Sequence, residues 1–460
     1  MTEQTRESEA TDEETFGLDD QTVDQVLGAV RSGDAAALAK LIDPLHAADV
    51  ADILEQIDPS TRRDFVQLWG GGIDGDILSE LDEGLREEVI DALAPDELAD
   101  AVRDLESDDV VDLLEDLEKP QQDAILDALD DSDRVAAERA LSYPEESAGR
   151  LMQREVVMGP EHWNVGQAID FLRNSKELPE QFYHMILVDP RMRPVGYVTL
   201  GKLLSAPRKT PLVDLIEESF RTFPATAPEE DVAYAFNQYH LISAPVTDED
   251  DRLVGVITID DAMNVLDEEH EEDILRLAGV GEESLSDRIW ETAKSRAPWL
   301  TVNLGTAILA SAVIAQFEDA IAQIVALAVL MPIIASMGGN AGTQSLTVAV
   351  RALATKDLTS RNSWRILRRE ALAGLINGLL FAFLMGLVGY FWYGSGALGM
   401  VLAAAMVINL VVAGIVGVGV PVVLDKIGID PALASGTFVT TVTDVAGFLA
   451  FLGLASAFLL

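Results

Sequence analysis

The sequence has 460 residues, of which 32 are Lys or Arg and 78 are Asp or Glu, so its formal net charge is -46 at pH 7. A chain this acidic offers no basic face to a phosphate backbone, which argues against nucleic acid as a partner and favours cations. It contains no cysteine, so disulfides, thiolate metal sites and thiol catalysis are excluded. The acidity is also compatible with a surface that serves only solubility, as in a protein of a saline habitat.

The charge is unevenly distributed along the chain. From Pro298 onward seven basic residues balance seven acidic residues, so the other 25 basic and 71 acidic residues all precede that point. The chain therefore consists of an acidic polar half followed by a neutral apolar half. Residues 1–20 are polar and acidic, without the apolar core of a signal peptide. We expect this stretch to be disordered.

Residues 21–145 show the periodicity of short amphipathic helices with a weak internal repeat. ADILEQIDPSTRRDFVQL at 51–68 is echoed by VDLLEDLEKPQQDAILDAL at 111–129. Stacked helix pairs of this kind form a superhelical array, so we predict an α-helical domain. Asp96 and Asp100 are four residues apart and share a helix face, where they repel each other unless a cation lies between them. They are either solvated or half of a cation site that another domain completes.

Residues 146–259 contain a tandem repeat. MILVDPRMRPVGYVTLGKLL at 185–204 aligns with APVTDEDDRLVGVITIDDAM at 244–263, an offset of 59. Each copy reads as a strand, a charged turn, a glycine, an apolar strand that ends in threonine, and a helix. This pattern resembles the cystathionine-β-synthase (CBS) domain, which occurs in pairs. The resemblance implies an α+β regulatory pair that could bind ATP, although the residues themselves do not identify a ligand.

Residues 260–297 read as an acidic connecting helix. Its carboxylates are Asp260, Asp261, Asp267, Glu268, Glu269, Glu271, Glu272 and Asp273, and no Lys or Arg occurs between Arg252 and Arg276. Like charges at four-residue spacing each cost roughly 0.2–0.5 kcal/mol, so the helix repels itself unless cations bridge it. Carboxylate oxygens suit Mg²⁺ or Ca²⁺ better than zinc. The alternative interpretation is a solvated linker.

Residues 298–460 are long enough and apolar enough for five membrane-spanning helices. We predict these at 298–317, 320–350, 371–393, 397–422 and 432–460. The loop at 351–369 carries six basic residues, which predicts a cytoplasmic position. The acidic half is then cytoplasmic, the C-terminus is external, and the protein lies in the inner (plasma) membrane.

Two of these spans carry polar groups. The stretch MPIIASMGGNAGTQSLTVAV at 331–350 combines glycines with the amides Asn340 and Gln344, and Asp444 lies in the middle of the last span. No Lys or Arg occurs inside any expected span. An unpaired carboxylate at mid-membrane costs about 3 kcal/mol on insertion scales, so Asp444 must be protonated, wetted or bound to a cation. A two-fold dimer would bring two such carboxylates to one axis, with Thr343 adding a neutral oxygen and Thr440, Thr441 and Thr443 available to hold water.

The order of these parts resembles the MgtE family of magnesium channels. The most specific marks are Pro332 with SMGGNAGTQ and the stretch DPALASGTFVTTVTDVAGF. The resemblance implies a homodimer with a pore on its two-fold axis, a carboxylate at Asp444 that holds hydrated Mg²⁺, and an acid at the pore mouth, Asp430. The candidate pore residues are Asp444, Asp430, Asn340, Gly338, Gly339, Gln344 and Thr441. The resemblance implies ligands for regulatory Mg²⁺ at Asp261, Glu269, Glu272, Asp273, Glu230, Asp96 and Asp100.

Three positions depart from the family pattern. Pro228, His240 and Asn264 stand where the resemblance leads us to expect carboxylates. The sensing site between the CBS copies is therefore expected to be weaker or rearranged, whereas the pore motifs show no such departure.

The sequence thus predicts a Mg²⁺-selective channel, not an enzyme, that closes when cytosolic Mg²⁺ is high. A transporter for Co²⁺, Mn²⁺ or Ca²⁺ is an alternative, although the chain lacks soft ligands for Co²⁺. An intramembrane aspartyl protease would need two carboxylates that share a proton, and only one acid is expected at mid-membrane. A membrane-bound nucleotide sensor without transport is the remaining alternative.

Overall fold

The computed structural model describes residues 18–280 and 289–460, apart from positions 104, 116, 118, 177 and 180. It divides into two compact units, Met1–Asp267 and Glu268–Leu460. The disorder expected for residues 1–20 falls mostly on residues 1–17, which lie outside the described residues, while Asp20 already begins the first helix. Part of the expected connector, residues 281–288, also lies outside them.

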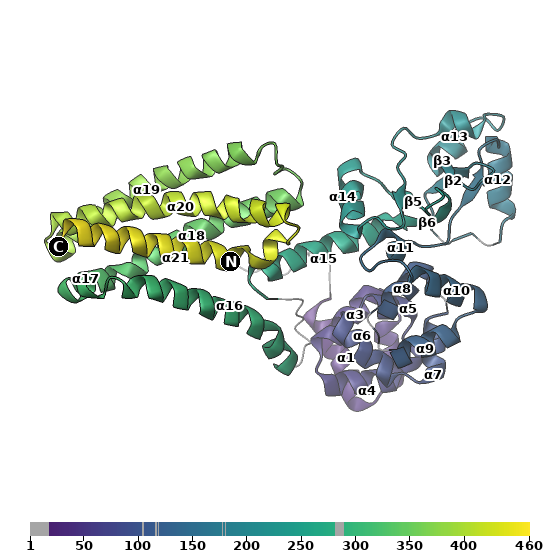
Figure 1. Ribbon diagram of the computed structural model, residues 1–460. Coiled ribbons are helices and arrows are strands. Elements are labelled where there is room, and N and C mark those ends of the chain that lie inside the picture. Colours follow the sequence, from purple (N-terminus) through teal and green to yellow (C-terminus); the bar gives the residue numbers. More distant parts are fainter. Residues whose placement is uncertain are drawn as a thin grey trace, which may run out of the picture. The chain divides into compact units, whose positions relative to one another are not determined.

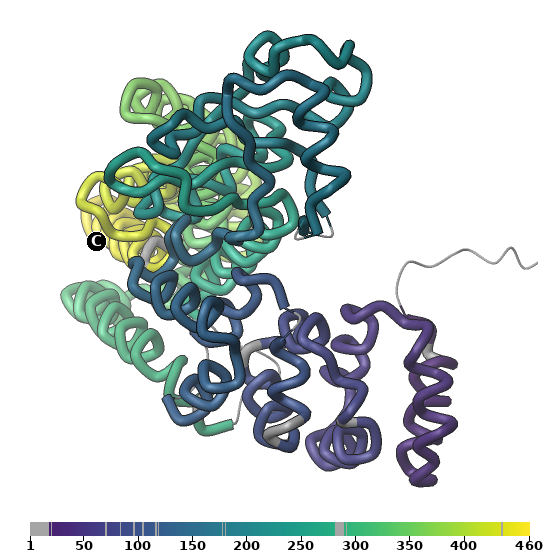
Figure 2. The backbone as a smooth tube through the Cα atoms, turned by 90° about the vertical axis from the view of Figure 1, so that its right-hand side faces the viewer, coloured from purple at the N-terminus to yellow at the C-terminus, as the bar shows by residue number. Residues whose placement is uncertain are grey.

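The first unit begins with an array of short helices that follow one another through space in chain order (Figure 2). The helices are α1 Asp20–Ser32, α2 Ala35–Ile42, α3 Ala47–Gln56, α4 Pro59–Trp69, α5 Gly75–Ser79, α6 Glu83–Ala92, α7 Pro95–Ala101, α8 Ser107–Glu115, α9 Lys119–Ala128 and α10 Asp131–Ala140. A 3₁₀ turn, η1, covers Gly70–Gly72. Their apolar faces meet in one core that includes Leu38, Phe65 and Leu113. Acidic caps begin several helices, as where Asp19 and Asp34 accept backbone N–H groups.

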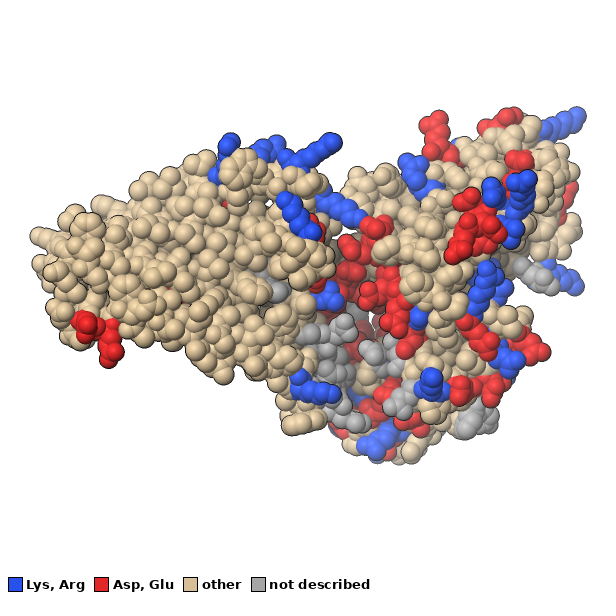
Figure 3. Space-filling view, in the orientation of Figure 1, with Lys and Arg blue, Asp and Glu red and all other residues tan. Residues whose placement is uncertain are grey.

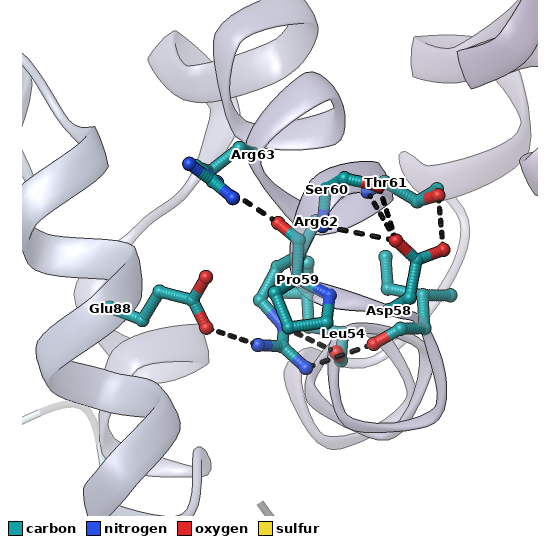
Figure 4. A network of polar contacts seen from close by, with 9 residues as sticks. Leu54, Asp58, Pro59, Ser60, Thr61, Arg62, Arg63 and Glu88 are labelled. Atoms are coloured by element: carbon teal, nitrogen blue, oxygen red, sulfur yellow. Dashed lines mark hydrogen bonds and ion pairs between the residues drawn. The ribbon is translucent and has the colours of Figure 1, made fainter. Parts of the chain in front are cut away.

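A buried arginine ties neighbouring helices of this array together (Figure 4). Arg62 of α4 is 4 % exposed and donates to the carbonyls of Leu54 and Ile57 at 2.8 and 2.9 Å. Its third contact is an ion pair with Glu88 of α6. Beside it Asp58 accepts hydrogen bonds from Ser60 and Thr61, and so starts α4. A buried charge needs this full set of partners, so the arginine fixes how α3, α4 and α6 pack.

The rest of the first unit contains two copies of one α+β motif. The first copy comprises α11 Ala148–Leu151, β1 Met158–Pro160, α12 Val165–Asn174, β2 His184–Val188, β3 Pro194–Thr199, α13 Leu200–Ser205 and the 3₁₀ turn η2 Leu212–Leu215. The second comprises β4 Phe223–Pro224, α14 Glu229–Tyr239, β5 Ser243–Thr247, β6 Leu253–Thr258 and the start of α15 Ile259–Leu277. Each copy has a three-stranded sheet with one parallel and one antiparallel pairing, in the orders β1-β2-β3 and β4-β5-β6.

The charged turns of the two copies are the same structure. Asp189 accepts the backbone N–H groups of residues 191 and 193, and Asp248 accepts those of residues 250 and 252. The glycine that follows each turn is also required. A Cβ at Gly196 would lie 2.6 Å from Ile216, and one at Gly255 would lie 2.7 Å from the carbonyl oxygen of Gln153. These features confirm the expected strand, turn, glycine and strand in both copies.

The second unit consists of long apolar helices (Figure 1). After the end of α15 come α16 Ile289–Ala315, α17 Glu318–Gln323, α18 Ala326–Ala354, α19 Ser363–Tyr393, α20 Gly396–Lys426 and α21 Pro431–Phe458. Five segments of the described chain are long and apolar enough to cross a membrane: Thr292–Ala315, Ala326–Ala354, Ser363–Tyr393, Gly396–Lys426 and Gly436–Phe458. The described chain therefore has the five candidate spans of a membrane protein.

Several span boundaries differ from the expected ones, and the first span begins at Thr292 instead of 298. The second span begins at Ala326, because α17 forms a separate short helix, and the third begins at Ser363, eight residues before the expected start at 371. The loop between α18 and α19 is correspondingly shorter.

α20 is the central helix of this unit and packs against α18, α19 and α21. Small residues permit close approach, as where a Cβ on Gly389 of α19 would lie 2.7 Å from the Cα of Gly399 of α20. Close packing of this kind is what holds helices together inside lipid.

Candidate functional site

The glycine-rich stretch of α18 presents two different faces. Gly338 and Gly342 are buried, and a Cβ on Gly342 would lie 2.6 Å from Val439 of α21. Gly339 has open space beside it, since a Cβ there would meet no atom within 4 Å, and Asn340 and Gln344 are exposed on the protomer. Helical spacing explains the division, since positions 338 and 342 lie on one side and 340 and 344 on another. Two candidate pore residues, Gly338 and Gly339, thus have separate roles.

Asp444 lies near the middle of α21 and is half-buried. Its carboxylate makes no hydrogen bond or ion pair with the described residues. The nearby threonines are occupied: Thr441 donates to the carbonyl of Thr437 at 2.6 Å, and Thr443 donates to that of Val439 at 3.0 Å. Thr443 is fully buried against α18 instead of accompanying Asp444. An acid in a candidate span that has no partner among the described residues is a candidate for binding an external cation.

Asn409 of α20 is a polar residue that the sequence analysis did not single out. It is fully buried, and its Nδ2 donates to the carbonyl of Ile334 in α18 at 2.8 Å, while its Oδ1 lacks a partner among the described groups. A Cβ on Gly338 would lie 2.2 Å from this amide, and one on Gly447 of α21 would lie 2.8 Å from it. The amide thus occupies the space that two glycines leave between α18, α20 and α21. The signal in the sequence was a single amide inside a long apolar run.

Glu370 is one of the seven acidic residues after Pro298, and the motifs of the sequence predicted no role for it. It lies in α19, and Ser345 of α18 donates a hydrogen bond to its carboxylate at 3.0 Å. The carbonyl of Glu370 also lies 2.5 Å from where a Cβ on Gly414 would be. This contact joins α18, α19 and α20 on the side where α19 begins.

Asp430 begins α21 and joins it to the end of α15. One oxygen accepts the backbone N–H of Ala432 at 2.8 Å, and the other pairs with Arg276 of α15 at 2.9 Å. Arg276 also pairs with Glu272, one turn earlier. The structure therefore brings two candidate acids, Glu272 and Asp430, to a single arginine. Glu269 and Asp273, which flank Glu272 in α15, are half-buried.

In the first unit, Asp261 meets an acidic cluster that the sequence analysis did not identify. The cluster comprises Glu106, Asp108, Asp109, Asp112 and Asp261. Four of these residues come from α8 or the residue before it, and Asp261 comes from the first turn of α15. The run ESDDVVDLLED could have indicated them, but so could several other acidic runs.

Burial and mutual repulsion shift the titration of this cluster. Burial, and then the charge of Asp261, raise the pKa of Asp109 to about 7. Burial is also the main cause that raises the pKa of Asp261 to about 6, against a hydrogen bond from Thr258 that lowers it. The pKa of Asp108, the most buried member, is raised for the same reasons. Across the described residues, no three His, Asp or Glu side chains converge closely enough to hold a metal ion. The carboxylates are near one another without forming a ligand cage.

The remaining candidate ligands lie elsewhere. Asp100 is paired with Arg103 at 2.6 Å, while the side chain of Asp96 lies outside the described residues. Glu230 is in the first turn of α14, where a negative charge interacts favourably with the helix dipole.

The three departures from the family pattern have structural places. Pro228 is the N-cap of α14 and His240 is its C-cap, with a left-handed φ of 53°. Asn264 is exposed on α15. The two caps delimit α14, which carries Glu230.

The comparisons with known proteins first give the class. Residues 331–454 match the family model MgtE, described as a divalent cation transporter, and this range contains Asp444 and lies among the apolar helices. Residues 45–146 match the MgtE intracellular N domain, and residues 148–209 and 212–268 match the CBS domain. The protein is thus a multi-pass transporter whose spans follow an N-terminal helical domain and a CBS pair.

Curated relatives then give the family. The chain is similar to "Magnesium transporter MgtE" of Thermus thermophilus, at 31% identity over 93% of this chain and 96% of that protein. It is also similar to proteins of the same name from Bacillus subtilis, at 28% over 96% of this chain and 98% of that protein, and from Enterococcus faecalis, at 35% over 69% and 70%. The chain belongs to the MgtE family of magnesium transporters.

A comparison with solved structures finds one that resembles about half of the chain. It is titled "Crystal structure of the cytosolic domain of the Mg2+ channel MgtE in complex with ATP", with 27% identity, a TM-score of 0.49, and coverage of 53% of this chain and 99% of that chain.

Proposed function

We propose that this magnesium transporter conducts Mg²⁺ through a pore in which Asp444 is the ion-binding carboxylate. The observation that carries the proposal is that Asp444 lies half-buried in a membrane-spanning helix without a partner among the described residues. An isolated carboxylate is costly in that position, and a cation would remove the cost.

The pore forms on the two-fold axis of a homodimer. One carboxylate is too few to hold a divalent cation, whereas a two-fold axis brings a second copy of the same residue. Support comes from Asn340 and Gln344, which are exposed on the protomer although they lie inside a span. Amides that face lipid are unfavourable, so a partner protomer or an aqueous pathway is the expected neighbour.

Mg²⁺ passes Asp444 in a largely hydrated form. Mg²⁺ gives up its water reluctantly and requires near-octahedral geometry. Two carboxylates would therefore hold the ion through its waters, with the amide oxygens of Asn340 and Gln344 as further acceptors. Selectivity then depends on the size of the hydrated ion and on how firmly α18 and α21 are packed.

Cytosolic Mg²⁺ closes the pore. The acidic cluster around Asp261 and the connector acids Glu269, Glu272 and Asp273 supply the regulatory sites, and the N-terminal half lies in the cytoplasm of a cell whose inner membrane holds the spans. Bound Mg²⁺ offsets repulsion among these carboxylates and favours the closed state. Such a ligand shifts the equilibrium only by its difference in affinity between the two states. ATP at the CBS pair would be a second regulator, and the hollow beside His184 and Ser243, about 30 Å³, would have to widen to hold it.

Flux measurements on the purified full-length protein in liposomes test the pore. We expect Asp444→Asn to abolish Mg²⁺ flux and Asp444→Glu, which keeps the charge, to retain part of it. Thr437→Val, on the same helix, is the matched control. Wild-type flux in Asp444→Asn would show that the pore assignment is wrong.

The same assay tests the regulation. We expect the variant with Asp261, Glu269, Glu272 and Asp273 changed to the amides to lose inhibition by Mg²⁺ on the cytosolic side. A control variant with four acids of α9, α10 and the turn between them changed in the same way keeps this inhibition: Asp123, Asp127, Asp130 and Asp131. Equal inhibition in both variants would contradict the gating proposal.

Transport of another divalent cation is the second candidate, because the family model covers divalent cations in general. Competition by Co²⁺, Mn²⁺ and Ca²⁺ in the liposome assay decides between them. A nucleotide sensor without transport predicts no flux of any of these ions.

A further inference from the structure

The first turns of α19 carry a basic stripe that ion conduction does not use. We define the arginine groove by its lining residues: Arg361, Trp364, Arg365, Arg368, Arg369, Leu372, Ala373 and Ile376. Arg361 lies two residues before α19, and Arg368 and Arg369 follow Arg365 by three and four residues, so these last three lie along one side of the helix. The apolar members continue that side toward the middle of the helix.

The groove is open and its charges are unpaired. Its volume is about 640 Å³. The Arg368 guanidinium lies 4.9 Å from the centre of the Trp364 ring, and Trp364, Leu372 and Ile376 are 61%, 59% and 67% exposed. None of its four arginines forms an ion pair with any residue that the structure describes. Lys and Arg side chains gather along this edge of the apolar unit in Figure 3.

The length of α19 places the groove at a membrane surface. The helix has 31 residues, about 46 Å at 1.5 Å per residue, against a hydrocarbon core of about 30 Å. Tyr390, Phe391 and Trp392 lie at its other end, where aromatic residues commonly mark the opposite interface. The arginines are then at the level of the lipid headgroups, and Leu372 and Ile376 are at the level of the upper acyl chains.

We propose that the arginine groove binds an anionic glycerophospholipid of the leaflet at which α19 begins. The planar guanidinium forks of Arg365, Arg368 and Arg369 match phosphate oxygens in pairs, which lysine ammonium groups do not. One acyl chain lies along Leu372 and Ile376, with Trp364 between the headgroup and the chain. A negatively charged leaflet attracts such a cluster.

The groove combines positive charge with an apolar part formed by Leu372, Ala373 and Ile376, and this combination favours a lipid over other anions. Free phosphate would pair with the arginines but leave Leu372 and Ile376 uncovered. An acidic segment of the chain itself would do the same. A lipid satisfies both halves of the groove at once and is always present beside a membrane-spanning helix.

Native mass spectrometry of the full-length protein in detergent tests the proposal. The probes are phosphatidylglycerol and phosphatidylcholine with identical acyl chains. We expect phosphatidylglycerol to bind about tenfold more tightly, and the variant Arg365→Gln/Arg368→Gln/Arg369→Gln to lose about tenfold of that affinity. The control Arg351→Gln/Lys356→Gln/Lys426→Gln removes the same charge from the apolar unit and should change it less than about twofold.

Three results would overturn the proposal. These are equal affinity for the two lipids, an equal loss in both triple variants, and displacement of phosphatidylglycerol by inorganic phosphate at millimolar concentration. Size-exclusion profiles and thermal unfolding establish that each variant is folded. If the groove variant is not, Arg368→Gln alone replaces it, with an expected loss of about threefold from the missing phosphate and Trp364 contacts.

Discussion

At the scale of single residues, one amide connects three membrane-spanning helices. Asn409 of α20 donates to α18 and lies against glycines of α18 and α21. Those helices carry Asn340 and Asp444, so the amide fixes how the two candidate pore residues are presented. Because the side chain is fully buried, even a methyl group added beside it has no free space.

Gly338→Ala should therefore destabilise the protein. Its Cβ would lie 2.2 Å from the Nδ2 atom of Asn409, and overpacking of this kind costs about 1–3 kcal/mol. Gly339→Ala is the matched control, since its Cβ meets nothing within 4 Å. Thermal unfolding in detergent measures both. A Gly338→Ala protein as stable as Gly339→Ala would show that α18 and α20 are not packed this closely.

The acidic cluster makes a prediction about pH. Both carboxyls titrate near about 3.9 in an unfolded chain, whereas burial raises the pKa of Asp261 to about 6 and that of Asp109 to about 7 in the folded state. The folded state thus binds more protons between about pH 4 and 7, so its stability falls as the pH rises through this range. Above about pH 7 the whole penalty is present, unless Mg²⁺ offsets it.

Unfolding of the full-length protein in a chelator, at pH 5.5 and pH 8, measures this effect. We expect a lower midpoint at pH 8, and a smaller difference in Asp109→Asn, whose amide does not ionise. Asp123→Asn, at an exposed position of α9, should behave like the wild type. Addition of Mg²⁺ at pH 8 should raise the midpoint in the wild type more than in Asp109→Asn. If all three proteins respond alike to pH, the cluster does not govern stability.

At the scale of elements, the end of α15 is attached to the start of α21. Arg276 pairs with both Glu272 and Asp430. The positive charge beside these two acids, where the sequence led us to expect Mg²⁺, is therefore an arginine of the connector itself. This ion pair links the connector directly to α21, the helix that contains Asp444. A movement of α15 would therefore act on α21 without an intermediate element.

The double-mutant cycle of Arg276→Gln and Asp430→Asn tests this attachment. Asparagine still caps α21, so Asp430→Asn removes the charge and keeps the cap. We expect each single variant to weaken inhibition by cytosolic Mg²⁺. We expect the double variant to weaken this inhibition by no more than either single variant does. Both side chains are about one-third exposed, so the coupling should be about 0.5–1 kcal/mol, a few-fold in the inhibitory concentration. Additive effects would mean that the two residues act separately.

Local patterns were enough to predict the elements but not the contacts between them. The repeat at an offset of 59 predicted both sheets, since Asp189 and Asp248 make the same turn with their own neighbours. The spans followed from apolar length alone. The partners of Asp261 did not follow, because α8 is about 150 residues earlier and only the tertiary fold brings Asp108 and Asp109 to it. Asn409 had a local signal, a single amide in a long apolar run, but its contacts with α18 and α21 follow only from the tertiary fold.

At the scale of the whole molecule, the two halves of the chain differ both in charge and in surroundings, because one is acidic and polar and the other is apolar and suited to lipid. The apolar unit places Asp444 near the middle of a candidate span without a partner among the described residues, while 71 of the 78 acidic residues belong to the polar half. One such acid per chain can bind a divalent ion only if two chains surround one pathway, because the second chain then supplies a second carboxylate.

Mixed dimers distinguish one shared pore from two separate ones. When wild-type and Asp444→Asn chains are produced in equal amounts with different affinity tags, random pairing makes about a quarter of the dimers fully wild type. If both carboxylates must hold the ion, Mg²⁺ flux in liposomes falls to about one quarter, because the mixed dimer is inactive as well. If each protomer has its own pathway, flux falls only to about one half. Mixed dimers isolated through both tags sharpen the measurement, since a shared pore predicts no flux from them and separate pathways predict half of the wild-type rate. Wild-type chains carrying the same two tags are the control for the purification.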